Sequence, residues 1–250
     1  MTKGSYIRLR QVCLATLDIR REEATISRIL DQSPCHKEQL DHFGLENVLF
    51  AVGGSFIELV APTRENTAVH RFLTRSKGHG GYMAIFDCSD VPARKKAAEK
   101  LKIRTAFERS DAKADLLQLN PKDTGMTLVK FDHHHGGEDR FGAYHWAGDN
   151  WQRELNTEID MIGITMKCQN ISDKTDQWSE LFGVSAHQDV ITLDHGSITF
   201  TPALKSENFS AMHLKCLDPE GVLLRAENER LTVQNGCFEL AGLKWNIHSA

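Results

Sequence analysis

The sequence predicts an α+β fold assembled from repeated βαβββ segments. Runs of alternating apolar and polar residues recur in four groups, each around one amphipathic helical pattern. Two predicted hairpins also share a glycine turn and a closing proline, in residues 47–62 (NVLFAVGGSFIELVAP) and 189–202 (DVITLDHGSITFTP). The sequence contains no GxGxxG, P-loop or GxSxG motif, which argues against dinucleotide-binding, P-loop and α/β-hydrolase folds.

The N-terminal half is expected to hold two of these repeats. Its predicted strands cover residues 8–17, 39–43, 46–51, 55–61, 82–88, 105–109, 114–120 and 126–132. Its predicted helices cover residues 18–31, 64–75 and 90–101. Gly53 and Gly54 are expected to form a tight hairpin turn, since glycine adopts positive φ without strain.

The C-terminal half is expected to hold two shorter repeats. Its predicted strands cover residues 159–168, 190–193, 197–202, 210–217, 231–233, 237–241 and 243–248, and its predicted helices cover residues 173–182 and 219–226. Residues 133–149 (HHHGGEDRFGAYHWAGD) show no periodicity and predict a long ordered loop. The expected organisation is therefore a first domain over residues 1–135, a connecting loop over 136–157 and a diverged second domain over 158–250.

Composition narrows the class of protein. The chain has 250 residues and a net charge of −4, which gives no general attraction to nucleic acid or to an anionic membrane. No apolar run approaches the roughly 20 residues that span a bilayer, and the first residues lack the apolar core of a signal peptide. The six cysteines are scattered without a C-x-x-C pair. We therefore expect a cytoplasmic protein with reduced thiols and with neither a nucleic-acid nor a membrane partner.

Glu58 is the most informative polar residue of the sequence. It interrupts an apolar predicted strand, where it shares one face with Phe56 and Val60. A carboxylate in such a position is costly unless it is paired or binds something. Glu58 is thus either a ligand or acid/base group in a cavity, or a structural carboxylate with a partner, and the residues alone leave both readings open.

Four stretches resemble the vicinal oxygen chelate superfamily, which includes glyoxalase I, methylmalonyl-CoA epimerase and the extradiol dioxygenases. They read QVCLATLDI, FIELVAPTRENTAVHRFL, GGYMAIFDCSD and LLQLNPKDTGMTLVKFD. The resemblance covers residues 8–132 and, as a repeat pattern only, residues 159–250. It implies two glyoxalase-like barrels, each a cup-shaped sheet made of two βαβββ repeats, and it implies a homodimer.

The resemblance also indicates where a metal would be held in the first cup. The four ligand positions of metal-using members fall on Gln11, Glu58, Tyr82 and Lys130. Only Glu58 is a strong ligand for a hard divalent cation, and the Lys130 ammonium would repel the ion or pair with Glu58 instead. A divalent metal is therefore left open, with the usual ligand set missing.

The second cup offers no better set. Its equivalent positions fall near Met161, Thr199, Ala211 and Asn246, with His213 two residues beyond Ala211 on the same strand face. This half is expected to be a structural or dimer-forming copy.

The function implied is that of a glyoxalase-like enzyme for a small oxygenated or acyl substrate. Proton transfer of the isomerase, epimerase or lyase type suits the residues best, with Glu58 as base and Lys130 or Tyr82 stabilising an oxyanion. Gln11, Trp146 and His133 are the expected substrate-binding residues.

Two alternatives remain at this point, and catalysis itself is left open. A non-catalytic small-molecule binding protein of the same fold would explain the missing metal ligands. An iron dioxygenase would need two histidines and one glutamate in one cup, which the sequence supplies only through the histidines at 133–135. Three consecutive histidines in an extended segment point in different directions, so a polar loop is the simpler interpretation.

Overall fold

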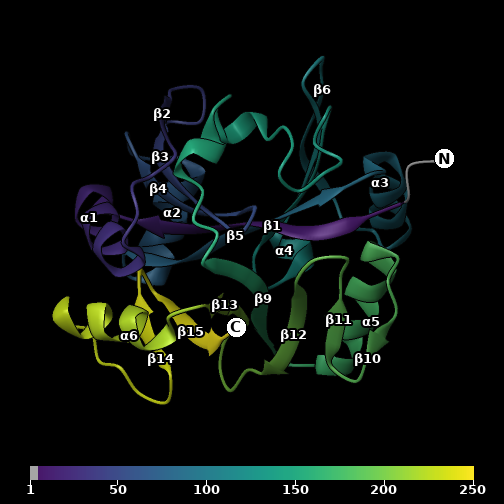
Figure 1. Ribbon diagram of the computed structural model, residues 1–250. Helices are drawn as coiled ribbons and strands as arrows, with labels where there is room; N and C mark the ends of the chain where they lie inside the picture. Colours follow the sequence, from purple (N-terminus) through teal and green to yellow (C-terminus); the bar gives the residue numbers. More distant parts are fainter. Residues whose placement is uncertain (1–4) are drawn as a thin grey trace. The chain divides into compact units, whose positions relative to one another are not determined.

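The computed structural model describes residues 5–250, and its N-terminal strands form one eight-stranded sheet (Figure 1). These strands are β1 (Ile7–Thr16), β2 (His36–Leu40), β3 (Leu45–Val52), β4 (Ser55–Pro62), β5 (His79–Cys88), β6 (Thr105–Ser110), β7 (Ala114–Leu119) and β8 (Leu128–His134). Their order across the sheet is β2-β3-β4-β1-β5-β8-β7-β6. The order places the two βαβββ repeats of this half side by side, joined through their first strands.

The C-terminal strands form a seven-stranded sheet with the order β10-β11-β12-β9-β13-β15-β14. These strands are β9 (Ile159–Cys168), β10 (Ala186–His187), β11 (Val190–Thr192), β12 (Ser197–Pro202), β13 (Asn208–Cys216), β14 (Cys237–Leu240) and β15 (Leu243–Ser249). The order again joins two repeats through their first strands. The predicted α+β class with two repeat-built sheets is confirmed.

The helices are mostly those that the sequence pattern predicted. They are α1 (Ile19–Leu30), α2 (Ala68–Ser76), α3 (Val91–Lys100), α4 (Pro121–Thr124), α5 (Ile171–Phe182) and α6 (Pro219–Asn228), with the short 3-10 helices η1 (His145–Ala147) and η2 (Trp151–Glu154).

The helix that follows the first strand of each repeat begins with the same local signal. A side-chain oxygen accepts a hydrogen bond from the backbone N–H three residues on, and this cap is Asp18 for α1, Asp90 for α3, Asn170 for α5 and Asp218 for α6. Such a cap satisfies one of the unpaired N–H groups at a helix start and stabilises the helix by about 1 kcal/mol. The strand-to-helix boundary is therefore encoded locally in all four repeats.

Some predicted elements were wrong in detail. Residues 231–233 form no strand, and the one-turn helix α4 and the short strand β10 were not predicted. The strand β8 continues to His134, because Asp115 and Ala114 of β7 pair with His133 and His134. Two of the three consecutive histidines therefore belong to a strand and not to the loop that follows it.

The chain divides into two compact units, each of which takes one repeat from each sheet. Unit 1 comprises Met1–Arg10, Met83–His145 and Gly163–Ser210, and unit 2 comprises Gln11–Tyr82, Trp146–Ile162 and Ala211–Ala250. The strands β1 and β5 run from one unit into the other. The predicted boundaries at residues 135 and 158 separate the strands of the first sheet from those of the second. That these two segments are separate domains stays a prediction.

Within unit 1, helix α5 supplies an aromatic side chain to the core. The Phe182 ring lies 4.6 Å from that of Phe86 on β5 and 5.0 Å from that of Phe131 on β8, both edge to face. Arg94 of α3 donates a hydrogen bond to the Leu181 carbonyl of α5 over 3.0 Å. These contacts hold the repeat that contains α3 against the repeat that contains α5.

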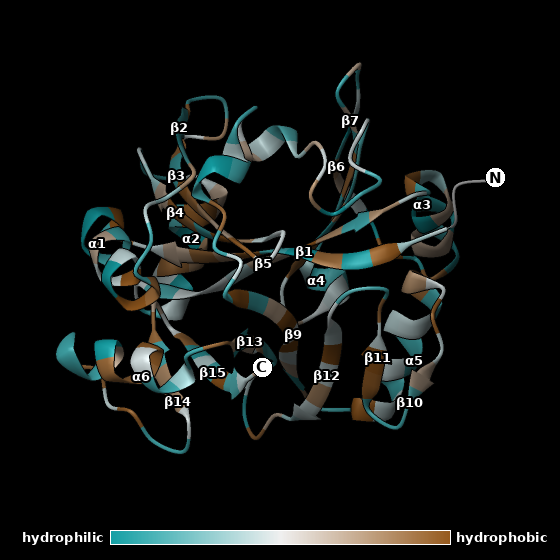
Figure 2. Ribbon diagram, in the orientation of Figure 1, coloured by the Kyte–Doolittle hydropathy of each residue, from teal (hydrophilic) through white to brown (hydrophobic). Residues whose placement is uncertain are grey.

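Within unit 2, α1 and α6 pack together in the same manner. Ile26, Ile29 and Leu30 of α1 are fully buried, and Arg225 of α6 donates to the Ile29 carbonyl over 2.8 Å. Figure 2 shows the apolar character of β3 and β4, the strands against which α1 lies. The hairpin between these strands turns at Gly53, whose φ of +52° is a conformation that other residues avoid.

Candidate functional site

Glu58 lies on β4 in unit 2, where two amide side chains hold its carboxylate. Gln11 Nε2 on β1 donates to Oε2 over 2.7 Å, and Asn47 Nδ2 on β3 donates to Oε1 over 2.8 Å. All three residues are at most 6% exposed. Since each carboxylate oxygen can accept two hydrogen bonds, this arrangement satisfies Glu58 and still leaves acceptor positions on it.

Strand register explains why these residues meet. Glu58 pairs with Cys13 across the parallel β1–β4 ladder and with Leu49 across the antiparallel β3–β4 ladder. Gln11 and Asn47 each lie two residues from those partners, so they point to the same face as Glu58 from diagonal positions. The sequence prediction that Gln11 lies at the Glu58 site is in line with this geometry, whereas Asn47 was missed.

The side-chain oxygen of Asn47 is a buried acceptor in this cluster. Its Oδ1 is buried and has no hydrogen-bond partner among residues 5–250. An unpaired buried acceptor costs about 1–3 kcal/mol, so such an atom beside a carboxylate is a natural contact for a ligand N–H or O–H group.

Tyr82 on β5 also belongs to unit 2, and the sequence analysis predicted it as a member of the same site as Glu58. Its ring packs edge to face on Phe72 of α2, with centroids 5.2 Å apart. Burial raises the pKa of the Tyr82 phenol well above its ordinary value, and Cys13 and Glu58 add to the shift. The phenol therefore stays protonated at neutral pH and is able to donate a hydrogen bond.

A cavity of about 490 Å³ lies on the α1 side of the same unit. Its charged lining carries both signs, with Arg20 and Lys37 opposed by Glu23, Glu38 and Glu46. Because the lining carries two cationic and three anionic side chains, its net charge is negative and the cavity offers no attraction to an anion. Of the Glu58 cluster, only Asn47 belongs to its lining.

Lys130 belongs to unit 1, where it forms an ion pair within its own strand. Its Nζ lies 2.9 Å from Asp132 Oδ2, and both residues are buried. Burial works against the ionised form of Asp132, but Lys130 and His134 outweigh it and hold the pKa of this carboxyl below its usual value. Lys130, Asp132 and His134 alternate along β8, so they share one face. That i, i+2, i+4 pattern is the sequence signal for this cluster, which the sequence analysis missed.

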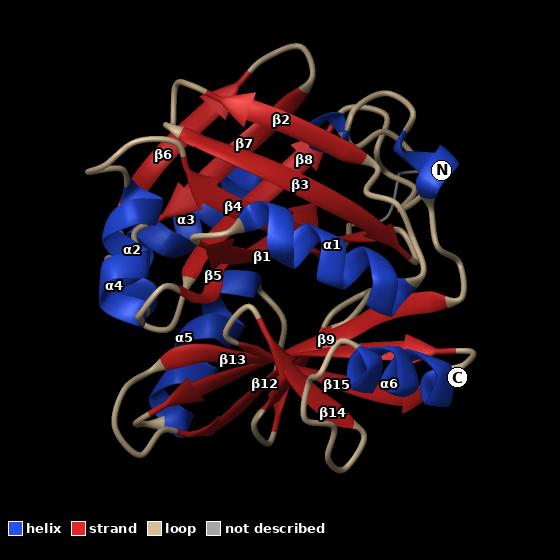
Figure 3. Cartoon of the chain, turned by 90° about the vertical axis from the view of Figure 1, so that its left-hand side faces the viewer, coloured by secondary structure: helices blue, strands red, loops and turns tan. Residues whose placement is uncertain are grey.

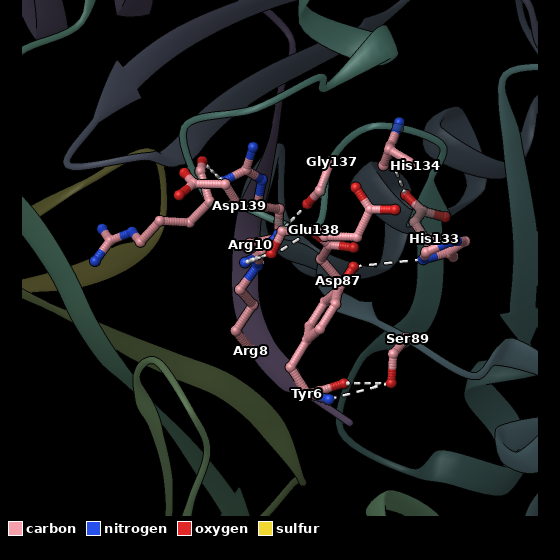
Figure 4. Close-up of polar contacts among 12 residues, drawn as sticks. Tyr6, Arg8, Arg10, Asp87, Ser89, His133, His134, Gly137, Glu138 and Asp139 are labelled. Carbon is pink, nitrogen blue, oxygen red and sulfur yellow. Dashed lines mark hydrogen bonds and ion pairs between the residues drawn. The ribbon is translucent and has the colours of Figure 1, made fainter. Parts of the chain in front are cut away.

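Two arginines of β1 form a second buried network in unit 1 (Figure 4). Arg8 donates to Asp87 Oδ2 through Nη2 over 2.6 Å and through Nε over 3.1 Å. Arg8 also donates to the carbonyls of Gly137 over 2.5 Å and Glu138 over 3.1 Å. These bonds fasten the start of the long loop onto the strand face.

Arg10 fastens the next part of the loop. Its Nη1 donates to the Arg140 carbonyl, and its guanidinium lies 4.7 Å from the centre of the Tyr144 ring. Burial lowers the pKa of Arg10 to about 10. The loop is thus ordered, as predicted, and the arginines that order it were missed.

The other sequence-predicted residues lie in both units. His133 of unit 1 has its Nδ1 3.4 Å from the Tyr6 hydroxyl, and Trp146 of unit 2 is half-buried in η1. Glu58, Gln11, Tyr82 and Trp146 belong to unit 2, whereas Lys130 and His133 belong to unit 1. The substrate-binding roles of Gln11, Trp146 and His133 and the catalytic roles of Glu58, Tyr82 and Lys130 stay predictions.

The four positions at which the superfamily holds a metal do not form a divalent-metal ligand set. Gln11 turns its Nε2, a donor, toward Glu58, and Lys130 contributes a cation that is paired with Asp132. In the described part of the chain, three or more His, Cys, Asp or Glu side chains nowhere gather in a way that could hold an ion. We therefore derive no chemical step through a metal at these positions.

Comparison with known proteins finds similarity in sequence and in fold. The human mitochondrial methylmalonyl-CoA epimerase is 26% identical over 128 residues, which is 50% of this chain and 73% of that protein. A hypothetical protein from Staphylococcus aureus superposes with a TM-score of 0.70 at 12% identity, covering 98% of this chain and 99% of its own. The fold is of the vicinal oxygen chelate type. No family model matches the chain.

A further solved structure is similar to about half of the chain. The methylmalonyl-CoA epimerase of Mycobacterium tuberculosis aligns with 54% of this chain and 93% of its own at 24% identity, with a TM-score of 0.47. The segment that this chain shares with the human epimerase is about half of this chain's length. No described helix is both long enough and apolar enough to cross a membrane.

The buried His134 predicts a pH dependence of stability. Burial lowers the pKa of His134 below its ordinary value of 6.5, although Asp132 and Asp87 act in the opposite direction. Below pH 6.5 the histidine is protonated in the unfolded chain but stays neutral in the folded chain, because its folded pKa is lower. The contribution of His134 to the free energy of unfolding is therefore complete above pH 6.5 and is lost as the pH falls toward the folded pKa. Urea denaturation between pH 7.5 and 5 should show a steeper loss for the wild type than for His134→Gln. Equal slopes would contradict a neutral buried His134.

Proposed function

We propose that the chain is an epimerase-like enzyme that removes the proton α to the thioester carbonyl of an acyl-CoA. The observation that carries the proposal is the buried Glu58 carboxylate, held by two amides within the unit that also contains the protonated Tyr82. The curated relatives are methylmalonyl-CoA epimerases, and one solved neighbour is described as a complex with methylmalonyl-CoA and NH4+. These names support a CoA thioester as the substrate class.

The proposed step uses residues of unit 2. Glu58 takes the α proton, and the electron pair of the broken C–H bond moves into the carbonyl to form an enolate. Tyr82 donates a hydrogen bond to the oxygen on which the negative charge develops. Asn47 Oδ1 accepts a hydrogen bond from the substrate, which gives this buried acceptor its partner. Lys130 and its ion pair with Asp132 are not needed for this minimal reaction.

Proton exchange at the α carbon is the direct test, because it requires the base alone and not the full inversion. The full chain is incubated with methylmalonyl-CoA in D2O, and deuterium at the α carbon is followed by mass spectrometry against a protein-free blank. We expect exchange faster than the blank. Tight binding of the thioester without exchange would favour the non-catalytic binding protein, and neither binding nor exchange would overturn the substrate class.

Tyr82 supplies a second, independent prediction. Replacing Tyr82 by phenylalanine removes the proposed oxyanion donor and keeps the ring that packs on Phe72. We expect kcat for exchange to fall by about 10²–10³-fold with little change in KM. Tyr6→Phe is the matched control, since burial also raises the pKa of the Tyr6 phenol but this residue lies in unit 1. Full activity of Tyr82→Phe would remove Tyr82 from the mechanism.

A further inference from the structure

Two histidines of unit 2 that the proposed reaction does not use place their ring nitrogens together. His213 is on β13 and His248 is on β15, and Nδ1 of the first lies 3.1 Å from Nε2 of the second. Their rings are nearly parallel, with an interplanar angle of 23° and centroids 5.3 Å apart. In the parallel ladder His213 pairs with Asn246 and Lys215 pairs with His248, so the two histidines are diagonal neighbours on one face.

The face of β13 and β15 that carries the two histidines is the more solvent-exposed face of this strand pair. Along β15 the buried residues Trp245 and Ile247 alternate with the less buried Asn246 and His248. Helix α6 packs against β14 and β15, and Figure 3 shows it beside these strands. His213 is half-buried and His248 is exposed, so solvent and solutes reach the pair.

The protonation state suits a ligand role. Burial, followed by His248 and Lys244, lowers the pKa of His213 to about 4. Its imidazole is therefore neutral at physiological pH, which is the form that binds metals. Lys244, Lys215 and, opposite Lys244 on β14, Glu239 are the charged groups on the same face of these strands.

We propose that His213 and His248 bind one divalent transition-metal ion, such as Zn²⁺, through Nδ1 and Nε2. Imidazole nitrogens lie about 2.0–2.1 Å from Zn²⁺, so two of them separated by 3.1 Å subtend an angle of about 100° at the ion, close to tetrahedral. Imidazole ligands suit Zn²⁺, Ni²⁺ and Cu²⁺ and not Mg²⁺ or Ca²⁺. Solvent or an anionic oxygen ligand completes the coordination.

The site is distinct from the positions that the superfamily resemblance supplies. Those positions are Ala211 on β13 and Asn246 on β15, and each histidine lies two residues further along its strand. The alternative to a bound metal is a hydrogen bond in which one imidazole N–H donates to the nitrogen of the other ring. A metal titration separates these two states.

The test is a titration of the untagged full chain with Zn²⁺ alone, followed by calorimetry and by NMR of the histidine ring nitrogens. We expect one Zn²⁺ per chain, with shifts in the His213 and His248 signals and binding that weakens as the pH falls below 6. His213→Gln and His248→Gln should each weaken binding by at least about tenfold, since one imidazole cannot chelate. His187→Gln, an exposed histidine of unit 1, is the matched control and should bind as the wild type does.

Two results would overturn the site. Zn²⁺ binding that survives in both variants would assign the ion to other histidines, such as those at 133–135. An unperturbed His213–His248 pair at saturating Zn²⁺ would show that the two rings share a proton. Thermal melts of the variants without metal check that both still fold, and the ring-nitrogen shifts of the wild type decide the question in either case.

Discussion

Replacing Glu58 by glutamine is expected to lower the rate of α-proton exchange by about 10²–10⁴-fold. The amide has nearly the same shape as the carboxylate but cannot take up a proton at neutral pH. It also turns one acceptor oxygen into a donor that faces Gln11 or Asn47, because both contribute N–H groups to Glu58. A stability loss of about 1–3 kcal/mol should therefore accompany the loss of activity.

Measuring both quantities separates the role of the base from folding. Glu46→Gln is the matched control, because Glu46 is an exposed glutamate on the neighbouring β3. It should leave exchange and stability unchanged. If Glu58→Gln exchanges the α proton at the wild-type rate, Glu58 is a structural carboxylate. In that case its hydrogen bonds with Gln11 and Asn47 account for the presence of a carboxylate on this apolar strand.

Removing Asp87 is expected to produce the largest loss of stability, about 3–5 kcal/mol for Asp87→Ala. Arg8 is 7% exposed and Asp87 is 1% exposed, so the substitution leaves a buried guanidinium without its carboxylate. Arginine cannot shed its proton to escape this cost. The carbonyls of Gly137 and Glu138 still accept hydrogen bonds from Arg8, but neither carries a compensating charge.

Urea denaturation of the wild type and the variant provides the measurement. The pair Arg104–Asp123 is a suitable control, since it also joins an arginine to an aspartate over 2.7 Å but lies at the surface. Asp123→Ala should change the midpoint little, because solvent screens an exposed pair. The double variant Arg8→Met/Asp87→Leu should recover part of the loss. A small effect of Asp87→Ala would mean that water or the loop carbonyls replace the carboxylate.

The order of strands and helices could be predicted because its signals are local. Period-two alternation defines the strands, and Asp or Asn directly before each of the four main helices defines where the helix begins. Glu58 was recognisable for the same reason, since a carboxylate within an apolar strand stands out against its immediate neighbours. The resemblance to the vicinal oxygen chelate superfamily rested on equally short stretches.

The partners of these residues were decided by tertiary structure. Gln11 and Asn47 meet Glu58 from 47 and 11 positions away, and Arg8 meets Asp87 from 79 positions away. Which residues become diagonal neighbours depends on strand register, and a slip of one residue would turn each side chain to the opposite face. Register follows from the burial of whole sheet faces and not from any local pattern. The sequence by itself therefore determined the elements and the single unusual carboxylate, whereas only the folded chain decided which amides hold Glu58 and which carboxylate pairs with Arg8.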